Sequence, residues 1–94
     1  MEDFDPVRWN PTITYVYFIV CGKYVKIGIS SRPKSRLYSV QVDSPFKCKL
    51  ESTIKLKGKH EALELEKEIH NKFSHLNKRG EWFKYNKEIK DYLK

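Results

Sequence analysis

Long hydrophobic runs are absent from this sequence of 94 residues, and so are internal repeats and glycine- or serine-rich linkers. A membrane-spanning helix needs about 18 or more consecutive apolar residues, so the sequence predicts no membrane span. The acidic stretch Met1–Asp5 also lacks the basic and then apolar pattern of a signal peptide. We therefore expect an intracellular, cytoplasmic protein with no membrane partner.

Cysteine is scarce as well. Only Cys21 and Cys48 are present, and they do not have a Cys-x-x-Cys spacing. Two isolated cysteines support neither a zinc cluster nor a disulfide framework. We predict that both side chains are buried or half-buried thiols.

The chain is too short to bury two hydrophobic cores, which excludes two-domain enzymes. Its hydrophobic content of 39% and aromatic content of 14% are too high for a disordered basic tail. Lys and Arg number 19 against 12 Asp and Glu, and the net charge of +7 favours a polyanionic partner. Nucleic acid is the first candidate, and the alternative is a lysine-rich surface that only keeps the protein in solution.

Hydrophobic patterns predict a small α+β domain over residues 12–94, preceded by an irregular arm over residues 1–11. β-branched and aromatic residues predict a hairpin of two strands, 13–20 and 24–29, with its loop at 21–22 or 22–23. The other predicted elements are a helix, a strand, a long helix, an extended segment and a last helix: 33–42, 46–57, 59–76, 80–85 and 86–93. The expected architecture is ββαβα plus a short C-terminal element, with a three-stranded antiparallel sheet flanked by helices.

Side-chain alternation divides the predicted hairpin into two faces. The first face is apolar and should pack in the core: Val16, Phe18, Val20, Val25, Ile27 and Ile29. The second face predicts a polar, aromatic surface: Tyr15, Tyr17, Ile19, Lys26 and Gly28. In the strand over 46–57, alternation places all the apolar side chains on one face and a mainly basic row on the other.

Four residues of this second face and of the following helices carry chemical groups: Tyr17, Lys26, Arg36 and Glu66. Among the charged residues of its helix, Glu66 lies closest to the apolar stripe, about 60° from the centre of the stripe. Each residue alone has a plain structural explanation, such as core packing, a snorkelling lysine, surface charge or a boundary glutamate. Together they supply a hydroxyl, two cations and a carboxylate, which phosphodiester hydrolysis with a divalent metal ion requires.

The order of the short motifs resembles the GIY-YIG endonuclease superfamily. Tyr15-Val16-Tyr17 corresponds to the first motif and Lys26-Ile27-Gly28 to the second, with Arg36 and Glu66 in the two following helices. The later segment Gly-Glu-Trp-Phe at 80–83 is similar to the compact branch common in phage, other viral and bacterial genomes. The resemblance covers most of the chain.

The resemblance implies a GIY-YIG-like fold and specific roles. Tyr17 would act as general base on a water molecule, Arg36 would stabilise charge on the scissile phosphate, and Glu66 would bind one Mg²⁺ or Mn²⁺ ion. Lys26, in a place where the family usually has tyrosine, would lower the pKa of the Tyr17 phenol or bind a phosphate. Two residues compete for the place of the asparagine that many relatives carry after the glutamate: Asn77 and Glu81.

Further contacts with nucleic acid are expected around these residues. Gly28 would let the DNA backbone approach, and His70 has the alternative of a half-buried histidine bonded to a neighbour. The expected nucleic-acid contacts are Tyr15, Gly28, Arg32, Lys34, His70 and Arg79. DNA is the expected partner, with RNA as the alternative, for a monomer or homodimer.

Our leading hypothesis is a metal-dependent DNA endonuclease that acts by a one-metal mechanism. The first alternative is a catalytically silent GIY-YIG-fold module that only binds nucleic acid. The second is a small domain that binds an acidic partner protein.

Overall fold

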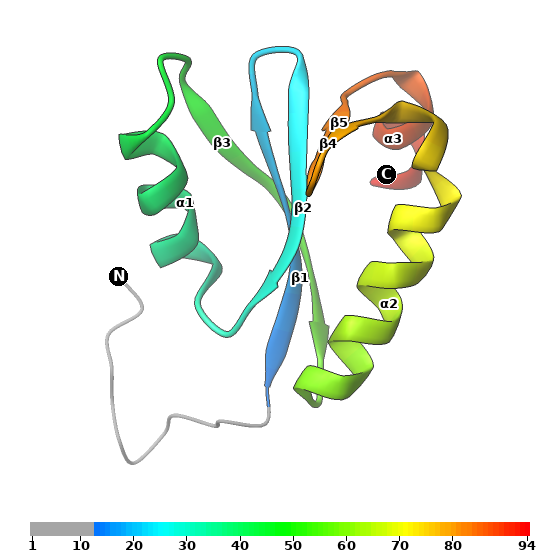
Figure 1. The fold of residues 1–94 in the computed structure, drawn as a ribbon. Helices are drawn as coiled ribbons and strands as arrows, with labels where there is room; N and C mark the ends of the chain where they lie inside the picture. The colour runs from blue at the N-terminus through cyan, green and yellow to red at the C-terminus, as the bar shows by residue number, and fades with distance from the viewer. Residues whose placement is uncertain (1–12) are drawn as a thin grey trace.

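Strands β1 (Thr14–Cys21) and β2 (Tyr24–Ser30) form the central hairpin in a computed structural model that describes residues 13–94 (Figure 1). Tyr17 pairs with Gly28, which places the two-residue loop at 22–23 and confirms the second of the two predicted registers. Gly22 has a φ of 63°, a left-handed conformation that costs glycine little. The predicted arm over residues 1–11 lies outside the described residues.

A third strand, β3 (Cys48–Leu56), pairs with β1, and two short strands, β4 (Asn77–Arg79) and β5 (Trp82–Lys84), follow later in the chain. The sheet has five strands in the order β3-β1-β2-β5-β4, and every neighbouring pair is antiparallel. The prediction of a three-stranded sheet is therefore wrong, although the fold is α+β. The additional strands, β4 and β5, form a hairpin that extends the sheet beyond β2. Gly80 lies in their turn with a φ of 55°. Strands of three residues carry too short an alternation to be recognised in a sequence.

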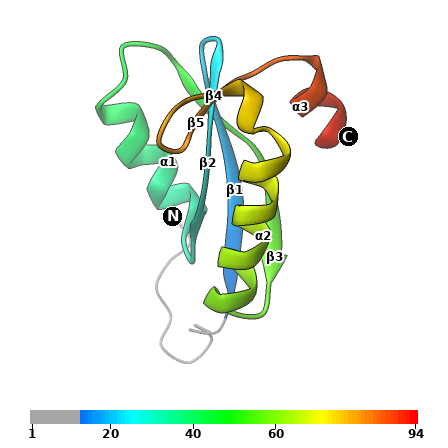
Figure 2. The ribbon, with the colours of Figure 1, turned by 45° about the vertical axis from the view of Figure 1, so that its right-hand side comes forward.

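Helices cover both faces of this sheet (Figure 1 and Figure 2). α1 (Pro33–Val42) packs on one face, and α2 (Lys59–Lys72) and α3 (Lys87–Tyr92) pack on the other. α2 ends before residue 76, where we predicted its end, because the 3₁₀ turn η1 (Ser74–Leu76) follows it. Within the described part of the chain, none of the helices is both long enough and apolar enough to cross a membrane.

Two hydrophobic clusters lie on opposite sides of the sheet. The larger contains the predicted apolar face of the hairpin, packed against α2 and α3. The smaller contains Tyr17 and Ile19, with Leu37 and Val40 of α1 packed against them. The prediction of a polar surface on this second face is wrong, because α1 covers it and leaves Tyr17 only 1% exposed.

A β-bulge in β3 (Cys48–Leu56) divides the apolar side chains of this strand between the two clusters. Phe18 pairs with Ser52 while Ile19 pairs with Leu50, so one additional residue, Glu51, lies between the two pairs. Leu50 therefore packs in the smaller cluster, and the side chains after the bulge pack in the larger one. The prediction of a single apolar face is wrong, because one inserted residue reverses the direction of every side chain beyond it.

Cys21 at the end of β1 and Cys48 at the start of β3 form a disulfide bond. The prediction that both side chains are buried is confirmed, and the prediction that they are free thiols is wrong. The two residues are direct partners in the β1–β3 register. A sequence separation of 27 residues does not indicate such a pairing, because it depends on how the strands align.

Candidate active site

Residues from both faces of the sheet meet at one edge of β2. β5 pairs with β2 from Tyr24 to Lys26, and one further hydrogen bond joins the Ile27 N–H to the Glu81 carbonyl oxygen at 2.9 Å. Beyond this bond, none of the described strands pairs with that edge of β2. Side chains from α2 on one face and from β1 and α1 on the other can therefore approach one another around Gly28.

Gly28 provides the space in which Tyr17 and Glu81 meet. A Cβ atom at position 28 would lie 2.6 Å from the Tyr17 hydroxyl oxygen and 2.7 Å from Glu81 Oε1, closer than real Cβ contacts. Glycine is found in a strand interior where another group approaches the backbone closely, and here that group belongs to the protein itself. The approach of a DNA backbone to Gly28 stays a prediction.

Glu81 contacts three of the four predicted catalytic residues: Tyr17, Lys26 and Glu66. Its carboxylate accepts a hydrogen bond from the Tyr17 hydroxyl and shares another with the Glu66 carboxyl group. Its Oε1 lies 3.4 Å from Lys26 Nζ, and the Lys26 side chain is only 21% exposed. Glu81 is therefore in contact with a tyrosine, a second carboxyl group and an ammonium group at this edge.

Sequence alone leaves Asn77 and Glu81 as equal candidates for the place of the family asparagine, and the geometry separates them. The Asn77 amide donates hydrogen bonds to the carbonyl oxygens of Gly80 (2.9 Å) and Trp82 (3.3 Å), so it holds the β4–β5 turn. Glu81 alone of the two belongs to the cluster. In the sequence, the only signal for Glu81 is that it directly follows the turn residue Gly80, which is weak. The pairing of β5 with β2 is what brings Glu81 next to Tyr17.

The Tyr17 phenol holds its proton strongly. Burial raises its pKa to about 12, with further increases from the Glu81 charge and hydrogen bond and from the Glu66 charge, while the Arg36 charge opposes them. We predicted that Lys26 lowers this pKa or binds a phosphate. The pKa is raised and Lys26 is not among the groups that shift it, while the phosphate contact stays a prediction. The ammonium group of Lys26 faces Glu81 and the Trp82 ring, whose centroid lies 5.4 Å from Nζ.

Glu66 is half-buried, whereas Glu61, Glu64, Lys67 and Glu68 on the same helix are exposed. This confirms its predicted position beside the apolar stripe. Burial raises the pKa of Glu66, and the charge and hydrogen bond of Glu81 raise it further, while His70 lowers it. Two carboxyl groups in contact at neutral pH repel each other unless a proton or a cation lies with them.

These two carboxyl groups fit a hard divalent cation. Mg²⁺ is usually held by one or two carboxylates and keeps several of its water molecules. No cluster of three or more His, Cys, Asp or Glu side chains suited to a metal occurs among residues 13–94. Glu66 and Glu81 are the carboxyl groups that this edge offers to a cation, and a bound dication would relieve their repulsion.

The remaining residues predicted to contact nucleic acid take different positions. His70 donates from Nε2 to the Ile27 carbonyl oxygen at 2.9 Å and packs on Phe83, which fits the alternative of a half-buried, bonded histidine. Lys34 and Arg36 are exposed on α1, and Arg36 is close enough to Tyr17 for its charge to act on the phenol. Of the other three, Tyr15 is half-buried on β1, Arg32 is half-buried before α1, and Arg79 is exposed on β4.

Comparison with protein families identifies the domain. Residues 14–94 match the family model of the T5orf172 domain, and this range includes every helix and strand described above. Comparison with curated proteins and with solved structures gives no match. The T5orf172 domain is a phage-associated domain related to the GIY-YIG, nuclease-like fold family. The chain therefore belongs to the T5orf172 domain family.

Proposed function

We propose that this protein is a metal-dependent DNA endonuclease of the GIY-YIG type that hydrolyses phosphodiester bonds. The observation that carries the proposal is the cluster in which Glu81 contacts Tyr17, Glu66 and Lys26 at one open edge of the sheet, with Arg36 near Tyr17. A hydroxyl, two carboxyl groups and two cations supply what this hydrolysis needs. The net charge of +7 favours binding of a polyanion such as DNA.

Glu66 would hold the cation in this proposal, with the neighbouring Glu81 carboxyl group as a second candidate ligand. When bound, Mg²⁺ or Mn²⁺ would supply positive charge for the oxygens of the phosphate. The raised pKa of Glu66 means that cation binding also releases a proton from the site. Cleavage should therefore require more metal as the pH falls.

Tyr17 moves a proton without forming a free phenolate. With a pKa of about 12, the phenol stays protonated at neutral pH and donates to Glu81. When the water oxygen bonds to phosphorus, the water proton passes to the Tyr17 oxygen and the Tyr17 proton passes to Glu81. The bond from phosphorus to the leaving oxygen breaks, and that oxygen takes a proton from solvent. The hydrogen bond to Glu81 is the feature that makes this transfer available to a phenol with a raised pKa.

Lys26 and Arg36 neutralise the phosphate. Arg36 is exposed on α1, so its guanidinium group can form two hydrogen bonds to phosphate oxygens. Lys26 is directed to Glu81, and its ammonium group can exchange that contact for one with the phosphate because part of the side chain remains exposed. Both cations would stabilise the negative charge that develops on the oxygens during the reaction.

Cleavage of supercoiled plasmid, branched and single-stranded DNA in Mg²⁺ or Mn²⁺ tests the proposal. Glu66→Ala and Tyr17→Phe should each reduce cleavage at least about 100-fold. Glu68→Ala and Tyr38→Phe are matched controls, because both residues are exposed on helices outside the cluster. Cleavage that is the same in Glu66→Ala and Tyr17→Phe as in the controls would refute the assigned roles.

A module that binds nucleic acid without cutting it is the second candidate function. The observation that favours it is the pKa of about 12 for Tyr17, which leaves no phenolate to act as base at neutral pH. In that case DNA binding would weaken with salt, survive Glu66→Ala, and be accompanied by no cleavage in any metal ion.

A further inference from the structure

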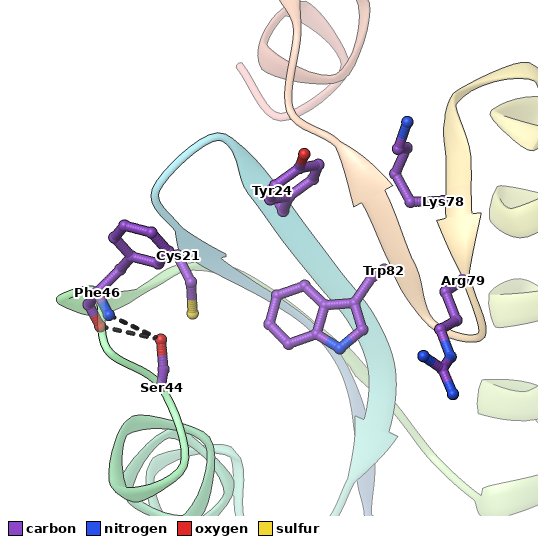
Figure 3. Close-up of a pocket in the computed structure, with 7 residues that line it drawn as sticks. All are labelled: Cys21, Tyr24, Ser44, Phe46, Lys78, Arg79 and Trp82. Atoms are coloured by element: carbon purple, nitrogen blue, oxygen red, sulfur yellow. Dashed lines mark hydrogen bonds between the residues drawn. The ribbon is translucent and has the colours of Figure 1, made fainter.

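A pocket of about 300 Å³ lies next to the proposed active site (Figure 3). Its lining is almost entirely apolar and comes from the β1–β2 hairpin, the α1–β3 loop and the β4–β5 hairpin: Cys21, Tyr24, Ser44, Phe46, Lys78, Arg79 and Trp82. Trp82 is directly opposite Lys26 in the β2–β5 pairing, and Lys26 contacts Glu81. Trp82, which lines the pocket, is therefore next to both Glu81 and Lys26 of the proposed active site.

The aromatic rings of Tyr24, Phe46 and Trp82 form the walls of the pocket, and few polar atoms are exposed inside it. Tyr24 is 40% exposed and Phe46 is 58% exposed, so large apolar surfaces face solvent here. Trp82 is half-buried, and Figure 3 shows its indole ring between Phe46 on one side and Lys78 and Arg79 on the other. Flat aromatic surfaces of this kind are suited to stacking with a planar ligand.

The backbone of Phe46 is held in place before any ligand arrives. Its N–H donates to Ser44 Oγ at 3.1 Å, and its carbonyl oxygen accepts from Gln41 Nε2 at 2.9 Å. Its ring lies over Gly22, where an added Cβ atom would be 3.5 Å from the nearest ring carbon. A loop whose backbone is already ordered loses less conformational entropy on binding than a disordered one.

Positive charge borders the same pocket. Lys78 and Arg79 of β4 are exposed, and neither has an ion-pair partner among the described residues. Arg79 pairs with Trp82 across the β4–β5 hairpin, so the cation and the indole ring are neighbours. An aromatic surface with adjacent basic groups matches a nucleotide, whose base stacks and whose phosphate is anionic.

We propose that this pocket binds one unpaired nucleobase of a DNA strand, with the adjoining phosphate on Lys78 and Arg79. The substrate would then be DNA with unpaired nucleotides beside the scissile bond, an inference that rests on the proposed endonuclease function. A base inside a duplex is stacked on its neighbours and cannot place its face against these rings. The pocket therefore favours single-stranded, flapped or bulged DNA over a blunt duplex.

Binding in EDTA, where no cleavage occurs, tests this site. A fluorescent single strand containing 2-aminopurine is compared with its blunt duplex by polarisation and by quenching of the 2-aminopurine. Tyr24→Ala with Phe46→Ala should weaken single-strand binding about tenfold or more and abolish the quenching, while duplex binding changes less than twofold. Both residues are exposed, so the domain should stay folded, and the single variant Phe46→Ala provides the same test with a smaller change.

Two further variants complete the experiment. Lys78→Ala with Arg79→Ala should weaken single-strand binding and reduce its salt dependence, by a slope of about 0.7 for each phosphate that is no longer neutralised. Tyr38→Ala is the matched aromatic control, because Tyr38 is 73% exposed on α1 and is not in the pocket. Equal affinities of the pocket variants and Tyr38→Ala, or an equal loss on single strand and duplex, would overturn the proposal.

The two proposals fail in different ways. If the wild-type protein cuts DNA but the pocket variants bind and cut all DNA forms as it does, the nucleobase site is wrong and the endonuclease proposal stands. If the variants lose single-strand binding as expected and the wild-type protein cuts no DNA, the nucleobase site stands and the endonuclease proposal is wrong. Absence of any DNA binding by the wild-type protein contradicts both.

Discussion

Replacing Gly28 by alanine is the most specific perturbation of the proposed site. The new methyl group would lie 2.6 Å from the Tyr17 hydroxyl oxygen and 2.8 Å from its Cζ atom. Ordinary contact begins at about 3.4 Å, so the phenol or the strand must move by about 0.8 Å. Tyr17 is 1% exposed and its ring packs in the smaller cluster beneath α1, so moving the ring would disturb that cluster.

The size of the effect follows from these contacts. Inserting a methyl group into a packed site costs typically about 1 to 3 kcal/mol of stability. A displacement of about 1 Å in a reacting group can cost about 100-fold in rate. We therefore expect Gly28→Ala to fold, to lose about 1 to 3 kcal/mol in the free energy of unfolding, and to cleave DNA about 100-fold more slowly.

Urea unfolding and single-turnover cleavage measure the two effects on the same preparation. Ile89→Val is a suitable control, because Ile89 is fully buried on α3 and the change costs about 0.5 to 1.5 kcal/mol in a core. This control should lose stability but keep its cleavage rate. Gly28→Ala with wild-type stability and a rate within threefold of wild type would refute the packing described here.

Three further predictions concern the charges of the cluster. Glu81→Gln keeps the shape of the side chain but removes the group that accepts the proton, so cleavage should fall at least about 100-fold. Ultraviolet titration of the same variant should show a lower pKa for Tyr17, because the Glu81 charge is lost. An unchanged cleavage rate would contradict the proton transfer. Glu66→Gln should raise the melting temperature by a few degrees in EDTA, because it removes the charge repulsion between Glu66 and Glu81. Added Mg²⁺ should raise the melting temperature of the wild type but not that of Glu66→Gln. A lower melting temperature of Glu66→Gln in EDTA would argue against the repulsion. Because the pKa of Tyr17 is raised from 10.0 to about 12, its contribution to stability is complete below pH 10 and is lost as the pH rises through 12, by at most about 2.7 kcal/mol. Urea unfolding of wild type and Tyr17→Phe between pH 9 and 12 should show the steeper loss in the wild type, and parallel curves would contradict the raised pKa.

The central part of the fold could be predicted from the sequence because its signals are local. Gly22 and the alternation around it define the β1–β2 hairpin, and the three- and four-residue spacing of apolar residues defines α2. The position of Glu66 beside the apolar stripe follows from helical geometry alone. These features depend on neighbours within one element.

The parts that could not be predicted depend on pairing between distant elements. The bulge at Glu51 is set by how β3 aligns with β1, and it also explains why the apolar residues of β3 divide between two clusters. The β4–β5 hairpin is short and becomes recognisable only through its pairing with β2. The disulfide between Cys21 and Cys48 likewise depends on the β1–β3 register.

The role of Glu81 shows the same limit within the site. Its place next to Tyr17 results from the β2–β5 pairing and from the absence of a side chain at Gly28. Sequence spacing identifies residues that carry suitable chemistry, such as Tyr17 and Glu66. It does not identify the residue that links them, because that contact forms across the edge of the sheet.

Glu66 is central to the proposed function, since that proposal assigns it the cation on which cleavage would depend. The most direct measurement is the single-turnover rate of supercoiled plasmid cleavage in Mg²⁺ by wild type, Glu66→Gln and the exposed control Glu68→Gln. We predict that Glu66→Gln is at least about 100-fold slower while Glu68→Gln matches the wild type. A rate for Glu66→Gln within threefold of the wild type would contradict this role.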